Sequence, residues 1–257
     1  LFTSTRPDGT TPLSRDGAPV HRGLGVGGWA ERVVVPQEGA VKVDEDVDLA
    51  EACVIGCAVQ TGVGAVLETA RVEEGATVLV LGAGGIGIAV VQGARLAGAS
   101  VIAVADPVAE RREAARRFGA THVVDPDEVD VTAFAMDLTS VGMDYCFEAA
   151  GVAALIERGI DAVRPGGTVV GVGAAPIDQG ITIPIAAAFT TTEKRLLGCL
   201  LGSVNAHRDI PRLLALARAG RLDLSGMITD RYPLDEVDAA VDNLRRRRGI
   251  RTSLTIG

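Results

Sequence analysis

The sequence predicts an α/β protein built on a doubly wound parallel sheet, with a second lobe formed by the two flanks. Between about residues 60 and 201, short apolar runs alternate with stretches of helical character. This alternation is typical of strand–helix–strand units. The runs are continuously apolar, as expected for strands buried on both faces. We therefore divide the chain into segments 1–59, 60–201 and 202–257.

The first strand–helix unit contains the most informative motif. A β-branched, apolar run at 77–81 leads into Gly82, Gly84 and Gly87, and a helical stretch follows at 88–96. In a Rossmann unit the first glycine makes a tight turn, the second lets a pyrophosphate approach the backbone, and the third packs the helix on the strand. The phosphates lie at a helix N-terminus, which favours anions. This unit therefore predicts a dinucleotide site.

The second strand of this unit, at 100–105, ends on an acidic residue. Asp106 stands where a carboxylate accepts hydrogen bonds from a ribose 2′-hydroxyl and repels a 2′-phosphate. The sequence therefore predicts NAD rather than NADP. Arg111, five residues later, opposes this preference because a nearby arginine accepts a phosphate; alternatively, it is a solvated residue of the next helix.

The remaining elements follow in order. We expect strands at 121–124, 143–147, 167–172, 181–184 and 196–200, and helices at 129–138 and 153–163. Ligands of such sheets bind outside the carboxyl ends of the strands, so segments 148–151 and 172–174 should line one cleft with the glycine loop. In the flanks we expect a strand at 32–36, helices at 210–219 and 234–247, and a last strand at 252–256. The four arginines at 245–248 are interpreted as a solvated helix end.

Composition agrees with an enzyme in the cytoplasm. The formal charge of −8 disfavours nucleic acids and anionic membranes as partners. The apolar stretch 76–105 contains a glycine cluster and Arg95, so it is interpreted as strand, helix and strand rather than a membrane span. The four cysteines lack the spacing of a disulfide framework, and no signal-peptide pattern is present.

Several motifs together resemble the zinc-dependent medium-chain alcohol dehydrogenases along the whole chain. They are GCAVQTGVG at 56–64, GAGGIG at 82–87, Asp106, FGAT at 118–121, FEAAG at 147–151, IRTSLT at 250–255 and the opening residues 1–11. The resemblance implies an NAD-dependent alcohol dehydrogenase with a Rossmann domain at 60–201. Segment 1–59 would then be the remnant of a GroES-like β lobe, to which 202–257 returns. It also implies a catalytic zinc, a small alcohol or aldehyde substrate, and a homodimer or homotetramer.

The resemblance also assigns roles to individual residues. Cys57 matches a ligand of the catalytic zinc, and Thr61 matches a catalytic residue that contacts the nicotinamide. The remaining matches are to cofactor-binding positions: Gly82, Gly84, Gly85, Ile86 and Gly87 in the pyrophosphate loop, Asp106 at the adenosine ribose, Val172 and Leu201 at the nicotinamide, and Arg251 at the pyrophosphate.

The sequence departs from the family pattern at the metal site. It lacks the other cysteine ligand, the GHE segment with the histidine ligand and the four cysteines of a structural zinc. We expect surface or structural roles for His21, His122 and His207. Because a catalytic zinc needs three protein ligands, we do not expect this chain to hold the metal. Three alternatives stay open: the C-terminal part of a longer zinc enzyme, a truncated and inactive NAD-binding protein, or a zinc-free quinone or enone reductase.

Overall fold

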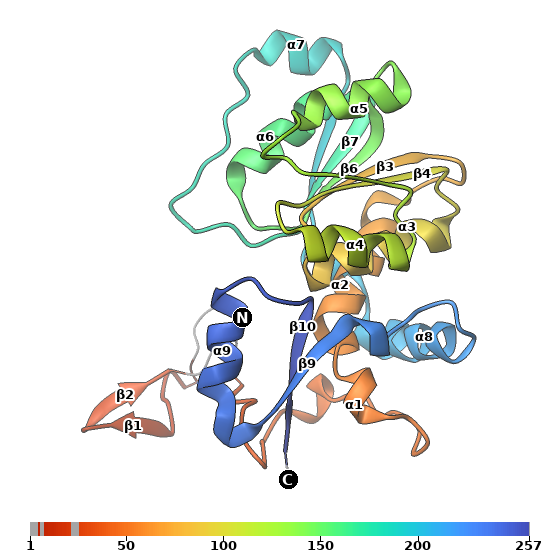
Figure 1. The fold of residues 1–257 in the computed structure, drawn as a ribbon. Helices are drawn as coiled ribbons and strands as arrows, with labels where there is room; N and C mark the ends of the chain where they lie inside the picture. The colour runs from red at the N-terminus through yellow and green to blue at the C-terminus, as the bar shows by residue number, and fades with distance from the viewer. Residues whose placement is uncertain (1–4, 6–7, 22–25, 257) are drawn as a thin grey trace.

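The computed structural model describes residues 5, 8–21 and 26–256, so part of the opening segment 1–11 lies outside the described residues. Its centre is a parallel six-stranded sheet with strand order β5-β4-β3-β6-β7-β8 (Figure 1). The strands are β3 (Thr77–Leu81), β4 (Val101–Ala105), β5 (His122–Val124), β6 (Met143–Glu148), β7 (Val163–Gly171) and β8 (Arg195–Gly198). This confirms the doubly wound parallel sheet.

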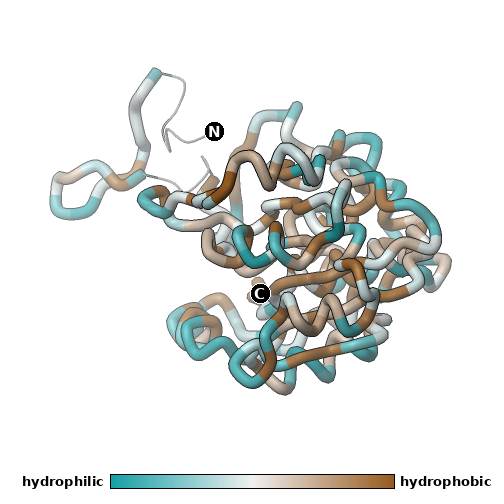
Figure 2. The backbone as a smooth tube through the Cα atoms, turned by 90° about the horizontal axis from the view of Figure 1, so that it is seen from above, coloured by the Kyte–Doolittle hydropathy of each residue, from teal (hydrophilic) through white to brown (hydrophobic). Residues whose placement is uncertain are grey.

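Helices cover both faces of the sheet (Figure 1). Helices α3 (Gly85–Ala97) and α4 (Ala109–Phe118) lie on one face, and α5 (Val131–Thr139) and α6 (Ala153–Ala162) lie on the other. In β3, Val78 and Val80 belong to one apolar core, whereas Leu79 and Leu81 belong to the other. Figure 2 shows the apolar segments gathered in the interior of this body. The strands are continuously apolar because helices cover both faces of the sheet, so that neither face contacts solvent.

A nearly unbroken helical segment precedes the sheet. It comprises α1 (Leu49–Ala52), the π-helical turn Ile55–Val59, α2 (Gln60–Gly64) and a second π-helical turn, Ala65–Ala70. It packs closely on α3: a Cβ at Gly62 would lie 2.5 Å from Ala89 Cβ and 2.6 Å from the Ile86 carbonyl oxygen. Gly62 of the 56–64 motif is therefore a position at which α2 packs directly against α3.

The flanks form a smaller second body below the sheet in Figure 1. It contains α8 (Ala206–Arg218) and a β–α–β unit in which β9 (Ile228–Pro233) and β10 (Arg251–Thr255) pair in parallel around α9 (Val237–Arg245). A short hairpin of β1 (Leu13–Arg15) and β2 (Ala18–Val20) projects from it. Helix α7 (Ala186–Thr191) lies beyond α5, at the far end of the sheet from this body.

Two predicted strands are wrong. Residues 32–36 form no strand, and Val34 is 93% exposed. Residues 181–184 are also irregular and exposed, and they lead into α7. Both runs are β-branched and end in proline, but neither has a neighbouring strand to pair with, and propensity alone does not make a strand.

Two elements of the second body differ from expectation. The sequence does not predict strand β9, because its second to fourth residues are consecutive polar or charged residues and no apolar run marks it. Helix α8 begins at Ala206 rather than at 210, because the Asn205 side chain accepts a hydrogen bond from the Arg208 N–H and caps the helix. No helix within the described residues is long and apolar enough to cross a membrane.

Candidate functional site

The glycine loop between β3 and α3 has the backbone geometry of an anion cradle. Gly82 has a φ of +97°, which favours glycine. A side chain at Gly87 would collide with the Gly82 carbonyl oxygen, so this glycine packs the helix against the strand. At Gly84 an added Cβ would meet no atom within 4 Å. The second glycine of the motif therefore leaves the backbone open to a ligand, at the N-terminus of a 13-residue helix.

Asp106 connects the end of β4 to the glycine loop. Its side chain is buried, with Oδ2 accepting a hydrogen bond from the Ala83 N–H at 2.7 Å and Oδ1 accepting one from the Val108 N–H at 2.8 Å. Each carboxylate oxygen keeps a further lone pair for a ligand hydroxyl. Asp106 thus shapes the loop and also borders the cavity described below.

Arg251, at the start of β10, lies directly against the glycine loop. A side chain at Gly85 would collide with the Arg251 guanidinium. The Arg251 Nε is buried and has no hydrogen-bond partner among the described residues. Burial lowers the pKa of Arg251, and the electrostatic effect of Cys57 opposes this. A buried guanidinium nitrogen without a partner beside an open helix N-terminus fits an anionic ligand.

These groups border one cavity of about 530 Å³, here named the glycine-loop cavity. Its walls are the glycine loop, the end of β4, the turn after β6 and the turn between α9 and β10. The volume lies within the ordinary range for cofactor sites. The cavity volume, the open backbone at Gly84 and the unpartnered Arg251 Nε together show that the residues present fit a dinucleotide.

The turn after β6 is held by Glu148, whose side chain is fully buried. Its Oε1 accepts hydrogen bonds from the consecutive N–H groups of residues 150–152, at 2.6–3.1 Å. Its carbonyl oxygen accepts hydrogen bonds from the Val172 and Gly173 N–H groups, both at 2.9 Å. The predicted cleft segments 148–151 and 172–174 are therefore joined to each other, and the former borders the glycine-loop cavity.

A second cavity, of about 880 Å³, lies on the other side of Arg251 and is here named the Cys57 cavity. Cys53, Cys57, Trp29 and Arg251 are among its lining residues, and none of the described residues that line it is a histidine, aspartate or glutamate. Among residues 5, 8–21 and 26–256, no group of three potential metal ligands exists. The described donor set around Cys57 therefore does not fit zinc.

The structure brings only some of the predicted residues together. Gly82, Gly84, Gly85, Ile86, Asp106, Arg111 and Arg251 line the glycine-loop cavity. Thr61 is buried in α2, Val172 is buried just after β7, and Leu201 lies in a turn with a φ of +50°. None of these three lines either cavity. Their assignment to the nicotinamide stays a prediction.

The histidines lie away from both cavities. His21 is exposed beside the β1–β2 hairpin, and His122 opens β5 as expected. His207 lies in the first turn of α8, and its Nε2 is 2.9 Å from the Glu38 carbonyl oxygen. Each histidine is therefore placed at the surface or in a structural contact.

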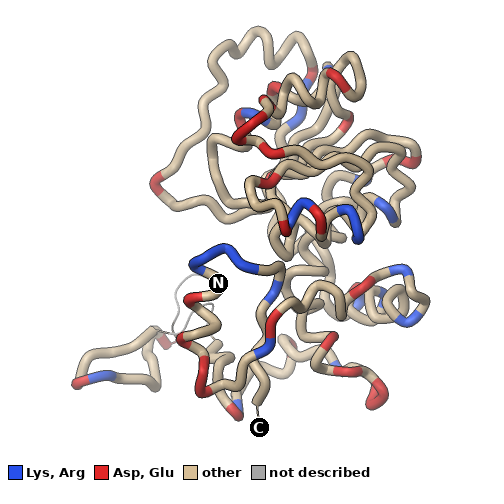
Figure 3. Tube along the Cα trace, viewed as in Figure 1, with Lys and Arg blue, Asp and Glu red and all other residues tan. Residues whose placement is uncertain are grey.

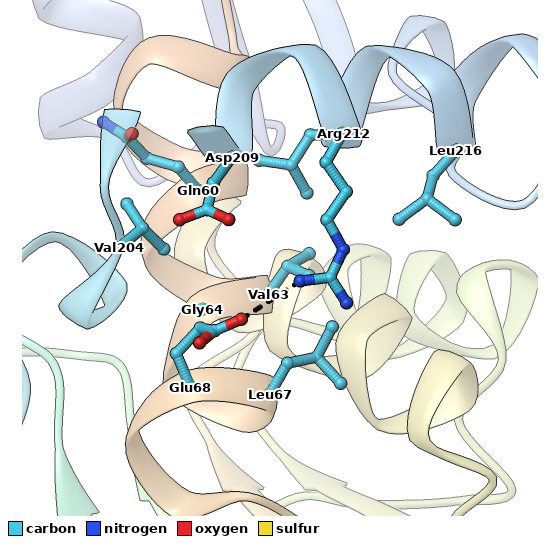
Figure 4. A pocket seen from close by; sticks show the side chains of 10 residues that line it. Gln60, Val63, Gly64, Leu67, Glu68, Val204, Asp209, Arg212 and Leu216 are labelled. Atoms are coloured by element: carbon cyan, nitrogen blue, oxygen red, sulfur yellow. Dashed lines mark hydrogen bonds and ion pairs between the residues drawn. The ribbon is translucent and has the colours of Figure 1, made fainter. Parts of the chain in front are cut away.

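A third cavity, between α2 and α8, is too small for an organic ligand (Figure 4). Its volume of about 20 Å³ is on the scale of one water molecule. The Glu68 carboxylate and the Arg212 guanidinium face each other across it, with Oε1 and Nη1 at 3.1 Å. The contact joins the π-helical turn Ala65–Ala70 to α8 and does not indicate a ligand site.

Sequence reasoning missed the part of the glycine-loop cavity that comes from the C-terminal segment. Leu244, Arg247 and Ile250 line it. The arginine run was correctly placed at a helix end, since α9 ends at Arg245. However, no sequence signal distinguishes Arg247 from its neighbours, because only the turn after the helix decides which side chain faces the cavity.

Comparisons with known proteins agree with this geometry. The profile of the family described as zinc-binding dehydrogenase matches residues 85–219. An alcohol dehydrogenase class-3 from Cereibacter sphaeroides is 33% identical over 256 residues, which cover 96% of this chain and 68% of that protein.

Two solved structures are also similar. An alcohol dehydrogenase zinc-binding domain protein from Burkholderia ambifaria has a TM-score of 0.92 and 29% identity, covering 100% of this chain and 69% of that one. A putative zinc-binding dehydrogenase from Sinorhizobium meliloti 1021, bound to NADP, has a TM-score of 0.75 and 31% identity, covering 88% of this chain and 64% of that one. The chain thus spans about two thirds of the length of these relatives.

Proposed function

Because the chain belongs to the zinc-dependent medium-chain alcohol dehydrogenase family, we propose that it takes part in hydride transfer between an alcohol or aldehyde and NAD(P). The observation that carries this proposal is the unpaired, buried Arg251 Nε beside the open glycine loop. A pyrophosphate at the N-terminus of α3 would accept hydrogen bonds from that guanidinium and from the loop N–H groups.

The chain's residues would bind and orient the cofactor. Asp106 would accept hydrogen bonds from the adenosine ribose at one end of the glycine-loop cavity. The turn held by Glu148 would support the nicotinamide half at the other end. When bound, the nicotinamide supplies the redox chemistry by accepting hydride from an alcohol carbon or donating it to an aldehyde carbon.

The substrate would approach from the Cys57 cavity. Arg251 lines both cavities, so they meet at this residue. The described part of the Cys57 cavity is mostly apolar, which suits a small alcohol or aldehyde better than a charged substrate.

We further propose that the protein is a homodimer or homotetramer. Gel filtration coupled to light scattering would measure the number of subunits.

The experiment combines cofactor binding with turnover. NADH and NADPH binding to the purified protein would be measured by fluorescence titration, and NAD(P) reduction at 340 nm would be followed with primary, secondary and thiol–aldehyde-adduct alcohols, with and without added zinc. Saturable cofactor binding with alcohol-dependent reduction is the expected result. Binding with no turnover of alcohols would identify a dinucleotide-binding protein, and reduction of enones alone would identify a reductase. Absence of cofactor binding would overturn the proposal.

A further inference from the structure

The turn after α9 places an arginine where helices usually have glycine. The Arg248 N–H donates to the Asn243 carbonyl oxygen at 3.3 Å and the Arg247 N–H donates to the Leu244 carbonyl oxygen at 2.9 Å. These two bonds define a Schellman motif, whose left-handed residue is ordinarily glycine. Here that residue is Arg247, with a φ of +56°, although Gly249 follows only two residues later. The chain thus holds a long cationic side chain in a strained backbone position.

Arg247 shares the glycine-loop cavity with Arg111 of α4. The Arg111 Nε donates a hydrogen bond to the Gly249 carbonyl oxygen at 3.0 Å, so this side chain lies against the turn that carries Arg247. Neither arginine takes part in an ion pair within the described part of the chain. Figure 3 shows the basic stretch after α9 next to α4. Two guanidinium groups without carboxylate partners therefore border the same cavity.

These arginines lie at the ribose end of the cavity. Arg111 lies in the first turn of α4, five residues after Asp106, whose carboxylate marks the expected ribose position. Arg251, by contrast, lies at Gly85 in the phosphate loop. Both oxygens of Asp106 already accept a backbone hydrogen bond, which partly offsets the repulsion between its charge and a second anion.

We propose that Arg247 and Arg111 bind the 2′-phosphate of NADP, so that the chain accepts NADP as well as NAD. This inference rests on the proposed dinucleotide function. It opposes the preference for NAD that Asp106 alone predicts, because two guanidinium groups form charge-assisted hydrogen bonds to one phosphate.

The test uses isothermal titration of the full chain with two fragments that differ only in the 2′-phosphate: 2′,5′-ADP and 5′-AMP. The variant Arg247→Gly puts the favoured residue at the left-handed position, so the turn should stay folded. Arg246→Ala is the matched control, because Arg246 belongs to the same basic run but does not line the cavity. Circular dichroism would check that both variants are folded.

We expect the parent to bind 2′,5′-ADP at least about tenfold more tightly than 5′-AMP, as one strong charge-assisted contact provides. Arg247→Gly should lose most of this ratio, and Arg246→Ala should keep it. Equal affinities of the parent for the two fragments would overturn the inference while NADH binding still supports the dinucleotide function. An equal loss for both fragments in Arg247→Gly would also overturn it, since Arg247 would then contact a shared group. Failure of NADH and both fragments to bind would refute the proposed function itself.

Discussion

At the scale of single residues, the proposed binding role of Arg251 has the strongest structural support. It combines a buried, unpartnered nitrogen with a position against the phosphate loop, and burial lowers its pKa. A guanidinium in this setting gains its missing hydrogen bond only when an anion arrives. Substitution here should therefore weaken ligand binding much more than it weakens the fold.

We predict that Arg251→Ala weakens NADH binding at least about tenfold, the effect of losing a charge-assisted contact of about 1.5–3 kcal/mol. Fluorescence titration measures the affinity, and urea unfolding measures the stability. Arg245→Ala, at the exposed end of α9, is the control and should leave the affinity unchanged. An Arg251→Ala variant that binds NADH like the parent would remove this arginine from the site.

At the scale of elements, two helices approach closely through glycine. Within the 56–64 motif, Gly62 is required because α2 and α3 leave no room for a side chain there. Its backbone flexibility is less important than this close contact. In contrast, an added Cβ at Gly56 would meet no atom within 4 Å. Gly56 and Gly62, two of the three glycines of this motif, should therefore respond differently to the same substitution.

Gly62→Ala should lower the free energy of unfolding by about 2 kcal/mol, because overpacking forces the helices apart. Gly56→Ala should leave it unchanged or raise it by up to about 1 kcal/mol, since alanine favours helical backbone. Urea unfolding monitored by circular dichroism provides both values. Equal effects of the two substitutions would show that α2 and α3 do not pack as closely as described.

A second contact between elements joins β3 to β6 at their amino ends. The Thr77 N–H and hydroxyl both donate to Asp144 Oδ2 at 2.8 Å, and the Arg164 Nε donates to Oδ1 at 2.6 Å. Desolvation raises the pKa of Asp144, but the hydrogen bonds from Thr77 and Arg164 lower it more, so the pKa lies below its ordinary value of 3.8. The contact therefore stabilises the fold only while the carboxylate is charged.

Asp144→Asn should lower the free energy of unfolding by about 1.5 kcal/mol at pH 7, the usual scale of a hydrogen bond to a charged group. The folded-state pKa is depressed, so the advantage of the parent is complete above pH 3.8 and decreases as the pH falls through the folded-state pKa. Unfolding curves at pH 7, 5 and 3 would follow this difference. A difference that stays constant down to pH 3 would contradict the role of the charge.

At the scale of the whole molecule, the cofactor site joins segments far apart in the chain. The glycine loop and Asp106 follow strands β3 and β4 of the sheet, whereas Arg247 and Arg251 belong to the β9–α9–β10 unit. Figure 1 shows this unit below the sheet. A ligand that contacts both would hold the two bodies together. Its binding energy would then appear as stability of the native state.

NADH at about 100 times its dissociation constant should stabilise the protein by about 2.7 kcal/mol. For a chain of this size that corresponds to a rise in Tm of roughly 5 °C or more. Differential scanning fluorimetry measures this rise, and Arg251→Ala at the same NADH concentration should show a rise at most about half as large, because its NADH affinity is at least about tenfold weaker. An equal rise in both proteins would indicate that the ligand does not contact the second body through Arg251.

The sequence by itself determined the parallel sheet and the dinucleotide motif, because these depend on local patterns. The patterns that predict them lie within about 30 residues of one another. They are continuous apolar strands, glycines at fixed spacing and an acidic residue after the second strand. Conversely, the strands expected at 32–36 and 181–184 are absent, since strand formation depends on a pairing partner that no local pattern contains.

Only the tertiary structure decided which distant side chains complete the site. Arg247 is one of four consecutive arginines, and the left-handed turn after α9 alone brings it to the cavity. Arg251 reaches the glycine loop because β10, which pairs with β9, begins beside α3. A local pattern specifies backbone conformation over a few residues, whereas these placements depend on how two separately formed bodies pack.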